Sequence, residues 1–197
     1  MTIQPKRRIE RADILDRTDY LPIRKEQRAR MAALKQNRRV EVGPFATFYF
    51  ENWDTIRHQI LEMLYIENGG EPQIADEIEA YGPLVPTGGE LVATVMFEID
   101  DPVRRATQLS RIGGIERKTF LQAGGEQLRG IPDPDRENTS PEGKASSVQF
   151  FHFPLSPAAI DAFRTPGAQI LLGFDHPHYG HIALVPEPVR AALAADL

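Results

Sequence analysis

The spacing of apolar residues changes at Asn52 from every second residue to every third or fourth, and this change limits the folds open to the chain. Before it, in FATFYF (residues 45–50), side chains alternate between two faces, which is typical of a β-strand. After it, apolar residues recur along one side of a helix that Asn52 can cap and Gly69-Gly70 can end. This apolar stripe consists of Trp53, Ile56, Ile60, Met63 and Leu64. The sequence therefore predicts a strand followed directly by an amphipathic helix.

Other segments carry the same two signals. Strands are predicted for residues 39–50 (two strands, or one bent at Gly43-Pro44), 90–99, 146–155 and 168–175, with a hairpin turning at Gly124-Gly125. Helices are predicted for residues 22–37, opened by Pro22, and for 72–81, 101–112, 157–164 and a short segment behind Pro188. The polar, proline-rich residues 131–145 predict an exposed loop.

The order of these elements indicates the fold class. Strands arrive in runs and hairpins, without regular alternation of strand and helix, which disfavours a doubly wound sheet. A length of 197 residues fits one domain with a substantial core. We therefore expect a single α+β domain over residues 1–197, with an antiparallel or mixed sheet and helices packed on one face or end.

The composition excludes several classes of protein. The chain has no cysteine, so disulfides, thiolate nucleophiles and cysteine-ligated clusters are excluded. The longest apolar runs are too short to span a bilayer, and the N-terminus lacks the apolar core of a secretory signal. We expect a soluble, cytoplasmic protein with no membrane contact.

Charge is unevenly distributed along the chain. Residues 1–39 hold 12 basic and 5 acidic residues, whereas the remainder holds 11 basic and 23 acidic residues. This basic, helical N-terminal segment is expected to dock on its own acidic body or on that of a second subunit, and we expect a homodimer. Nucleic-acid binding through residues 6–39 is the less favoured alternative, because no recognition motif accompanies the charge.

The polar side of the helix at 52–67 carries a possible metal site. Asp54, His58 and Glu62 follow one another in steps of four, so their side chains stack on one face. Each step rises about 6 Å, which is too far for one ion to reach all three. His58 and Glu62 could form half of a site, or the row could be a solvated face with helical ion pairs. The candidates for a third ligand are Glu51, Glu67, Asp76, Glu77 and Glu79.

A second possible metal site lies in FDHPHYGH, residues 174–181. It combines Asp175 with His176, His178 and His181, and two histidines at i and i+2 share a face of an extended backbone. Iron, manganese or zinc would suit either set of ligands. The alternative is a turn at Pro177 with ordinary surface histidines.

Signatures of common catalytic sites are absent from the sequence. There is no GxxxxGK, no GxSxG and no HExxH, and the paired Glu-x-x-His of di-iron bundles is missing too. The sequence names no catalytic residue and no organic cofactor.

Several stretches, taken in order, resemble the bacterial family known as domain of unknown function 3501. They are ALKQNRRVEVGPFATFYFENWDTIRHQILEML, YGPLVPTGGELVATVMFEI, SSVQFFHFPL and DHPHY. The resemblance implies a context, since genes of this family often lie beside those for rubrerythrin-like di-iron proteins and an iron-sulfur oxidoreductase. It implies no activity and no catalytic residue.

Two hypotheses of function follow. The first is a non-enzymatic accessory or interaction protein for a peroxide- or iron-linked redox system, with a rubrerythrin-like protein or an iron-sulfur oxidoreductase as partner. The alternative is a small metalloprotein, possibly an oxidoreductase, ligated by Glu and His side chains.

Overall fold

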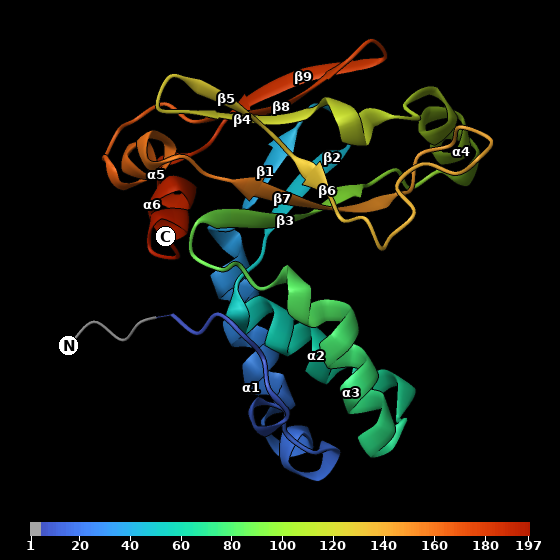
Figure 1. Cartoon of the computed structure of the whole chain (residues 1–197). Helices are drawn as coiled ribbons and strands as arrows, with labels where there is room; N and C mark the ends of the chain where they lie inside the picture. Colours follow the sequence, from blue (N-terminus) through green and yellow to red (C-terminus); the bar gives the residue numbers. More distant parts are fainter. Residues whose placement is uncertain (1–4) are drawn as a thin grey trace.

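A computed structural model describes residues 5–197 and confirms the α+β class. Its strands form two antiparallel sheets that face each other, and a layer of helices lies against the outer face of one sheet (Figure 1). The sequence predicted one antiparallel or mixed sheet, whereas the structure has two, both antiparallel. None of the helices in the described range is both long and apolar enough to cross a bilayer. Residues 1–4 of the basic segment lie outside the described part.

The first sheet has five strands in the order β1-β2-β3-β7-β6. Their bounds are Arg39–Val42, Ala46–Phe50, Glu90–Phe97, Val148–Pro154 and Ile131–Pro132. β1 and β2 form a hairpin, so residues 39–50 are two strands. Gly43 in its turn has φ +72°, and a Cβ there would lie 2.6 Å from the His181 ring, so glycine is required for two reasons.

The second sheet has four strands in the order β5-β4-β8-β9. Their bounds are Glu126–Arg129, Thr119–Ala123, Leu171–His176 and Tyr179–Leu184. The hairpin at Gly124-Gly125 is confirmed as the turn between β4 and β5. β9 was not predicted, because Pro177 and Gly180 suggested a longer turn; the turn occupies only Pro177 and His178.

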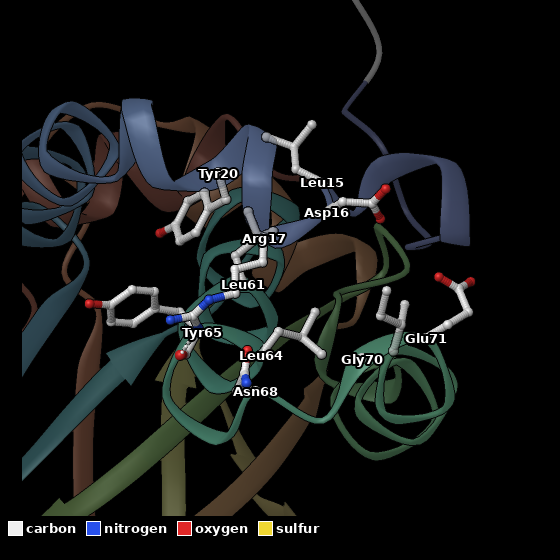
Figure 2. Close-up of a pocket in the computed structure, with 11 residues that line it drawn as sticks. Leu15, Asp16, Arg17, Tyr20, Leu61, Leu64, Tyr65, Asn68, Gly70 and Glu71 are labelled. Atoms are coloured by element: carbon white, nitrogen blue, oxygen red, sulfur yellow. Dashed lines mark hydrogen bonds between the residues drawn. The ribbon is translucent and has the colours of Figure 1, made fainter.

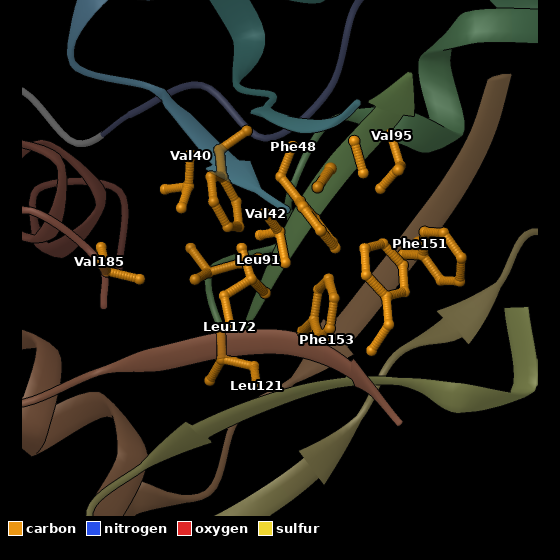
Figure 3. Packing of buried hydrophobic residues seen from close by; sticks show 14 of the residues in the cluster. Val40, Val42, Phe48, Leu91, Val95, Leu121, Phe151, Phe153, Leu172 and Val185 are labelled. Carbon is orange, nitrogen blue, oxygen red and sulfur yellow. The ribbon is translucent and has the colours of Figure 1, made fainter. Parts of the chain in front are cut away.

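The main core lies between the two sheets. Alternate residues of the first sheet point inward, among them Phe48, Val95 and Phe153, and meet Leu121 and Leu172 from the second sheet (Figure 3). All five are fully buried. Burying a side chain of this size contributes on the order of 1.5 to 3 kcal/mol, so this layer dominates the stability of the sandwich.

Three short helices close the ends of the sandwich. They are α4 (Pro102–Arg111), α5 (Pro157–Arg164) and α6 (Glu187–Ala194), with a 3₁₀ turn η3 (Ile115–Lys118) before β4. Asp101 and Ser156 cap α4 and α5 with their side-chain oxygens. The predicted positions of these helices are confirmed.

The helical layer consists of η1 (Arg11–Asp13), α1 (Arg17–Gln36), α2 (Trp53–Glu67), α3 (Gly70–Tyr81) and η2 (Gly82–Leu84). The predicted start of α1 was wrong, since the helix begins at Arg17 and contains Pro22. Pro22 lies on the exposed side of α1 near its start, where it removes a single backbone hydrogen bond.

α2 joins this layer to the first sheet through a second, smaller core. Ile56 and Ile60 pack with Val92, which is on the outer face of β3. The predicted stripe is only partly buried, because Leu61 is buried with these residues while Met63 is half exposed. The difference arises because α2 contacts α1 and α3 as well as the sheet.

Arg38 connects the helical layer, the first sheet and the C-terminus. Its guanidinium is 4 % exposed and donates to the carbonyl oxygens of Phe50 and Glu51 over 3.0 and 3.1 Å. It also forms an ion pair with Asp196, which follows α6. One buried cation thus fixes the point where β2 passes into α2.

The loop 131–145 is less free than its polarity suggests. Asp133 is buried, and its backbone N–H donates to the carbonyl oxygen of Phe150 over 2.9 Å. Arg136 donates to the carbonyl oxygen of Ala80 and stacks 4.3 Å from the ring centroid of Phe150. These contacts tie the first half of the loop to α3 and β7.

Replacing Ile60 with alanine should lower the free energy of unfolding by about 2 to 5 kcal/mol, because the side chain is fully buried and its loss leaves a cavity. Ile66→Ala on the same helix is the matched control, since Ile66 is 68 % exposed and should cost little. Denaturant unfolding of the two variants measures the difference. Equal losses would place the Ile60 side of α2 outside the core.

Candidate functional site

The row Asp54, His58 and Glu62 faces α1, so the solvated-face interpretation of it was wrong. Arg30 forms an ion pair with Asp54, and Arg24 forms one with Glu62. The contacts run in opposite directions along the two helices, which are therefore antiparallel. Arg24 and Arg30 of the basic segment thus contact acidic residues of the same chain.

The carboxylate of Glu62 is the most heavily bonded group in this row. Arg24 binds it in a bidentate manner, with Nε to Oε1 at 2.9 Å and Nη2 to Oε2 at 2.8 Å. The hydroxyl of Tyr20 donates to Oε1 over 2.7 Å and lies 3.4 Å from Nδ1 of His58. Tyr20 therefore joins His58 and Glu62 in one cluster.

Burial and charge shift the pKa values of this cluster. Burial alone would raise the pKa of Glu62, but hydrogen bonds from Arg24 and Tyr20 outweigh it and hold that pKa below its ordinary value. Burial lowers the pKa of His58, and the nearby Glu62 opposes this only in part. Burial, with Glu62 beside it, raises the pKa of Tyr20. The cluster thus contains a carboxylate, a neutral imidazole and a neutral phenol near neutral pH.

The candidate third ligands lie elsewhere. Glu51 accepts hydrogen bonds from Thr55 and Thr94, and Glu67 and Glu77 are both bound by the amide of Gln73. Across residues 5–197 no three His, Asp or Glu side chains gather as a set of metal ligands. The structure brings His58 and Glu62 together and places Arg24 where a metal ion would bind Glu62.

A cavity of about 290 Å³ lies on the other side of Tyr20, between the start of α1 and the α2–α3 junction. Figure 2 shows Arg17 beside Tyr65, with Tyr20, Leu61 and Leu64 around them. The guanidinium of Arg17 lies 4.8 Å from the ring centroid of Tyr65 and also donates to the carbonyl oxygen of that residue. These contacts fix the end of α2.

Two of the C-terminal histidines, His176 and His178, lie close together at the β8–β9 turn, with ring centroids 5.9 Å apart. Nε2 of His176 lies 3.3 Å from the carbonyl oxygen of Gly113, and its Nδ1 accepts from the backbone N–H of His178 over 3.2 Å. Both ring nitrogens of His176 are therefore engaged. His181 packs on Tyr179, with ring centroids 4.5 Å apart. Metal binding at His176 and His178 stays a prediction, as it does at His58 and Glu62.

An ion pair that was not predicted links β3 and β7. Nδ1 of His152 lies 3.0 Å from Oε2 of Glu90. This hydrogen bond raises the pKa of His152 and lowers that of Glu90. A histidine and a carboxylate 62 positions apart give no local signal, because strand pairing alone brings them together.

Comparisons with known proteins agree with this fold. A family model described as a protein of unknown function, DUF3501, matches residues 8–197. The chain is also similar to a solved structure from Burkholderia pseudomallei, a novel protein of unknown function, with 38 % identity and a TM-score of 0.88. The match covers 96 % of this chain and 98 % of that chain. No curated protein matches.

The two perturbed histidines should titrate on opposite sides of the ordinary value of 6.5, His152 above it and His58 below it. Proton NMR of the ring signals measures both midpoints. Glu90→Gln should lower the midpoint of His152 and leave that of His58 unchanged, because only His152 contacts Glu90.

The pH dependence of the free energy of unfolding should follow the directions of these two pKa shifts. A group whose pKa is raised by folding stabilises the fold at a pH below its unfolded pKa, and this contribution is lost as pH rises through the folded pKa. Glu90→Gln should therefore lower the free energy of unfolding more at about pH 5.5 than at about pH 8. A pKa that is lowered by folding has the opposite effect. The contribution of His58 to the free energy of unfolding therefore falls as pH drops below 6.5. An equal cost of Glu90→Gln at both pH values would contradict the assigned ion pair.

Proposed function

The chain belongs to the DUF3501 family, and we propose that it is a non-enzymatic accessory protein that binds an acidic partner protein through the outward face of α1. The observation that carries this proposal is a division of charge along α1. Arg24 and Arg30 form ion pairs with carboxylates of α2, whereas Lys25 and Arg28 form no ion pair within residues 5–197. The outward basic side chains are therefore available to a partner.

These side chains border an open groove of about 570 Å³, here called the basic groove. It is lined by Leu21, Arg24, Lys25, Arg28, Ala29 and Tyr65. Leu21 is 46 % exposed, which is high for a leucine on a packed helix. Arg24 stacks on Tyr65, 3.8 Å from the ring centroid, so the wall of the groove is held in place from α2.

An exposed apolar residue flanked by cations suits a protein surface that combines acidic and apolar side chains. On the family context given above, we propose that the partner is a rubrerythrin-like di-iron protein or an iron-sulfur oxidoreductase. The accessory protein would then serve a peroxide- or iron-linked redox system without carrying out its chemistry.

Lys25→Glu/Arg28→Glu should abolish binding to such a partner, because the double change reverses the charge of the groove without touching the α1–α2 contacts. Binding of the two purified candidate partners is measured by calorimetry at low and physiological salt, and the wild-type affinity should fall as salt rises. Arg104→Glu/Lys144→Glu makes the same change of charge at exposed positions outside the groove and should bind normally.

Two results would contradict the proposal. One is the absence of binding to either partner. The other is a salt-dependent mobility shift of DNA or RNA that Lys25→Glu/Arg28→Glu abolishes, because the groove would then be a nucleic-acid surface.

A metalloprotein is the second candidate, because His58 and Glu62 share the hydroxyl of Tyr20 within one cluster. A site there needs Arg24 to leave the carboxylate, and a further ligand to arrive from another element. Iron, manganese or zinc would suit an imidazole and a carboxylate. Such a site would add an oxidoreductase role to the same redox context.

We expect no micromolar binding when iron, manganese or zinc is titrated into the wild-type protein, because Arg24 occupies both oxygens of Glu62. Tight binding that His58→Ala abolishes and Arg24→Met strengthens would replace the accessory-protein proposal with the metal site. Tight binding that disappears only in His176→Ala/His178→Ala would move the site to the β8–β9 hairpin.

A further inference from the structure

A cavity of about 240 Å³ lies where the helical layer meets the outer face of the first sheet. Its floor is formed by β2, β3 and β7, and its cover by the first turns of α2, the end of α3 and η2 (Figure 1). On the floor, Tyr49, Thr94 and Phe150 are direct neighbours on three adjacent strands. This space is here called the Glu51 cavity.

The cavity contains a buried carboxylate without a cation. Glu51 is 9 % exposed, and within the described residues it forms no ion pair. Its Oε1 accepts from the hydroxyl of Thr94 over 2.7 Å, and its Oε2 accepts from the hydroxyl of Thr55. Two neutral donors leave half of the acceptor positions of a carboxylate free. A buried charge in this state is costly unless a cation joins it.

The walls suit an apolar or aromatic molecule. Tyr81 and Phe150 both contact Arg136, whose guanidinium lies 5.4 and 4.3 Å from their ring centroids. Met96 and Val148 continue the floor toward solvent and are 36 % and 37 % exposed. Both are apolar side chains on an open strand face. The cavity beside them gives a reason for this exposure, which the fold alone does not provide.

We propose that the Glu51 cavity binds a small organic amine, with the ammonium group on Glu51 and the apolar body against Tyr49, Tyr81 and Phe150. An ammonium supplies the missing positive charge and donates to the free carboxylate positions. The aromatic faces favour the same cation. A volume of about 240 Å³ limits the ligand to a molecule of metabolite size.

Two cations lie near the cavity, and one of them, Arg136, is stacked on its wall residues Tyr81 and Phe150. Lys35, at the end of α1, is among its lining residues and is only partly buried, so water screens its charge more than that of Glu51. It therefore opposes an amine at the rim less than Glu51 attracts one at the base. The proposal does not depend on the basic groove, which is lined by different residues.

The test compares phenethylamine, tyramine and isopentylamine with the alcohols of the same shape, by NMR titration of the full chain. The amines should bind at least about tenfold more tightly than the alcohols, because only they form a charge-assisted hydrogen bond with Glu51. The amide signals of Thr94 and Tyr81 should move. Glu51→Gln should remove the preference for the amine while keeping the shape of the side chain.

Two further variants make the result decisive. Glu79→Gln changes an exposed carboxylate of α3 outside the cavity and should bind as wild type. Val148→Trp should block the mouth and abolish amine binding, and it decides the case if Glu51→Gln unfolds in a thermal melt. No binding of any amine, equal binding of amines and alcohols, or amine binding that survives Val148→Trp would overturn the proposal.

Discussion

The arrangement of this molecule depends on the buried guanidinium of Arg38. It stands between the end of α1 and the start of β1, and it neutralises Asp196 at the opposite end of the chain. Its donors occupy the carbonyl oxygens of Phe50 and Glu51, which directly precede Asn52, the N-cap of α2. A buried ion pair of this kind contributes little net stability when intact, but loss of one partner is severely destabilising. Arg38 therefore links the helical layer, the first sheet and the C-terminus by polar contacts, beside the apolar contacts between α2 and β3.

The two faces of the five-stranded sheet have different surroundings. Its inner face meets the second sheet and is apolar except for Gln149, whose Nε2 donates to the carbonyl oxygen of Asn138. Its outer face is covered by helices at one end, where Val92 packs with Ile56 and Ile60. Beyond that contact the helices no longer cover the outer face. The apolar side chains of Met96 and Val148 on that face are therefore exposed. Because α2 leaves the sheet to pack between α1 and α3, the outer face is left with a cavity where the layers diverge.

Sequence periodicity was sufficient for the elements whose signal is local. The run of β-branched, aromatic and apolar residues at 90–99, the glycines of the β4–β5 hairpin and the stripe of α2 each lie within a short window. Partners across the chain have no such signal. Tyr20 and Arg24 are one helical turn apart, as are His58 and Glu62, but nothing local states that these two pairs face each other. The division of strands into two sheets was missed for the same reason, and β9 because Pro177 and Gly180 are also found in longer turns.

Two glutamates next to the same helix show how little residue type alone decides a role. Glu62 lies on α2 where α1 packs against it, and its carboxylate accepts three hydrogen bonds from Arg24 and Tyr20. Glu51 lies one residue before the N-cap of α2, and its carbonyl oxygen is fixed by Arg38 while its carboxylate turns into the cavity. The first is a structural anion with its counter-ion in place. Glu51 is held rigidly, and its carboxylate accepts hydrogen bonds only from hydroxyl groups. A ligand-binding group that is preorganised before its ligand arrives has these properties. The spacing of His58 and Glu62 places both residues where α2 faces α1, and metal binding there stays a prediction, whereas the carboxylate that we propose for an external cation is Glu51 at the strand end.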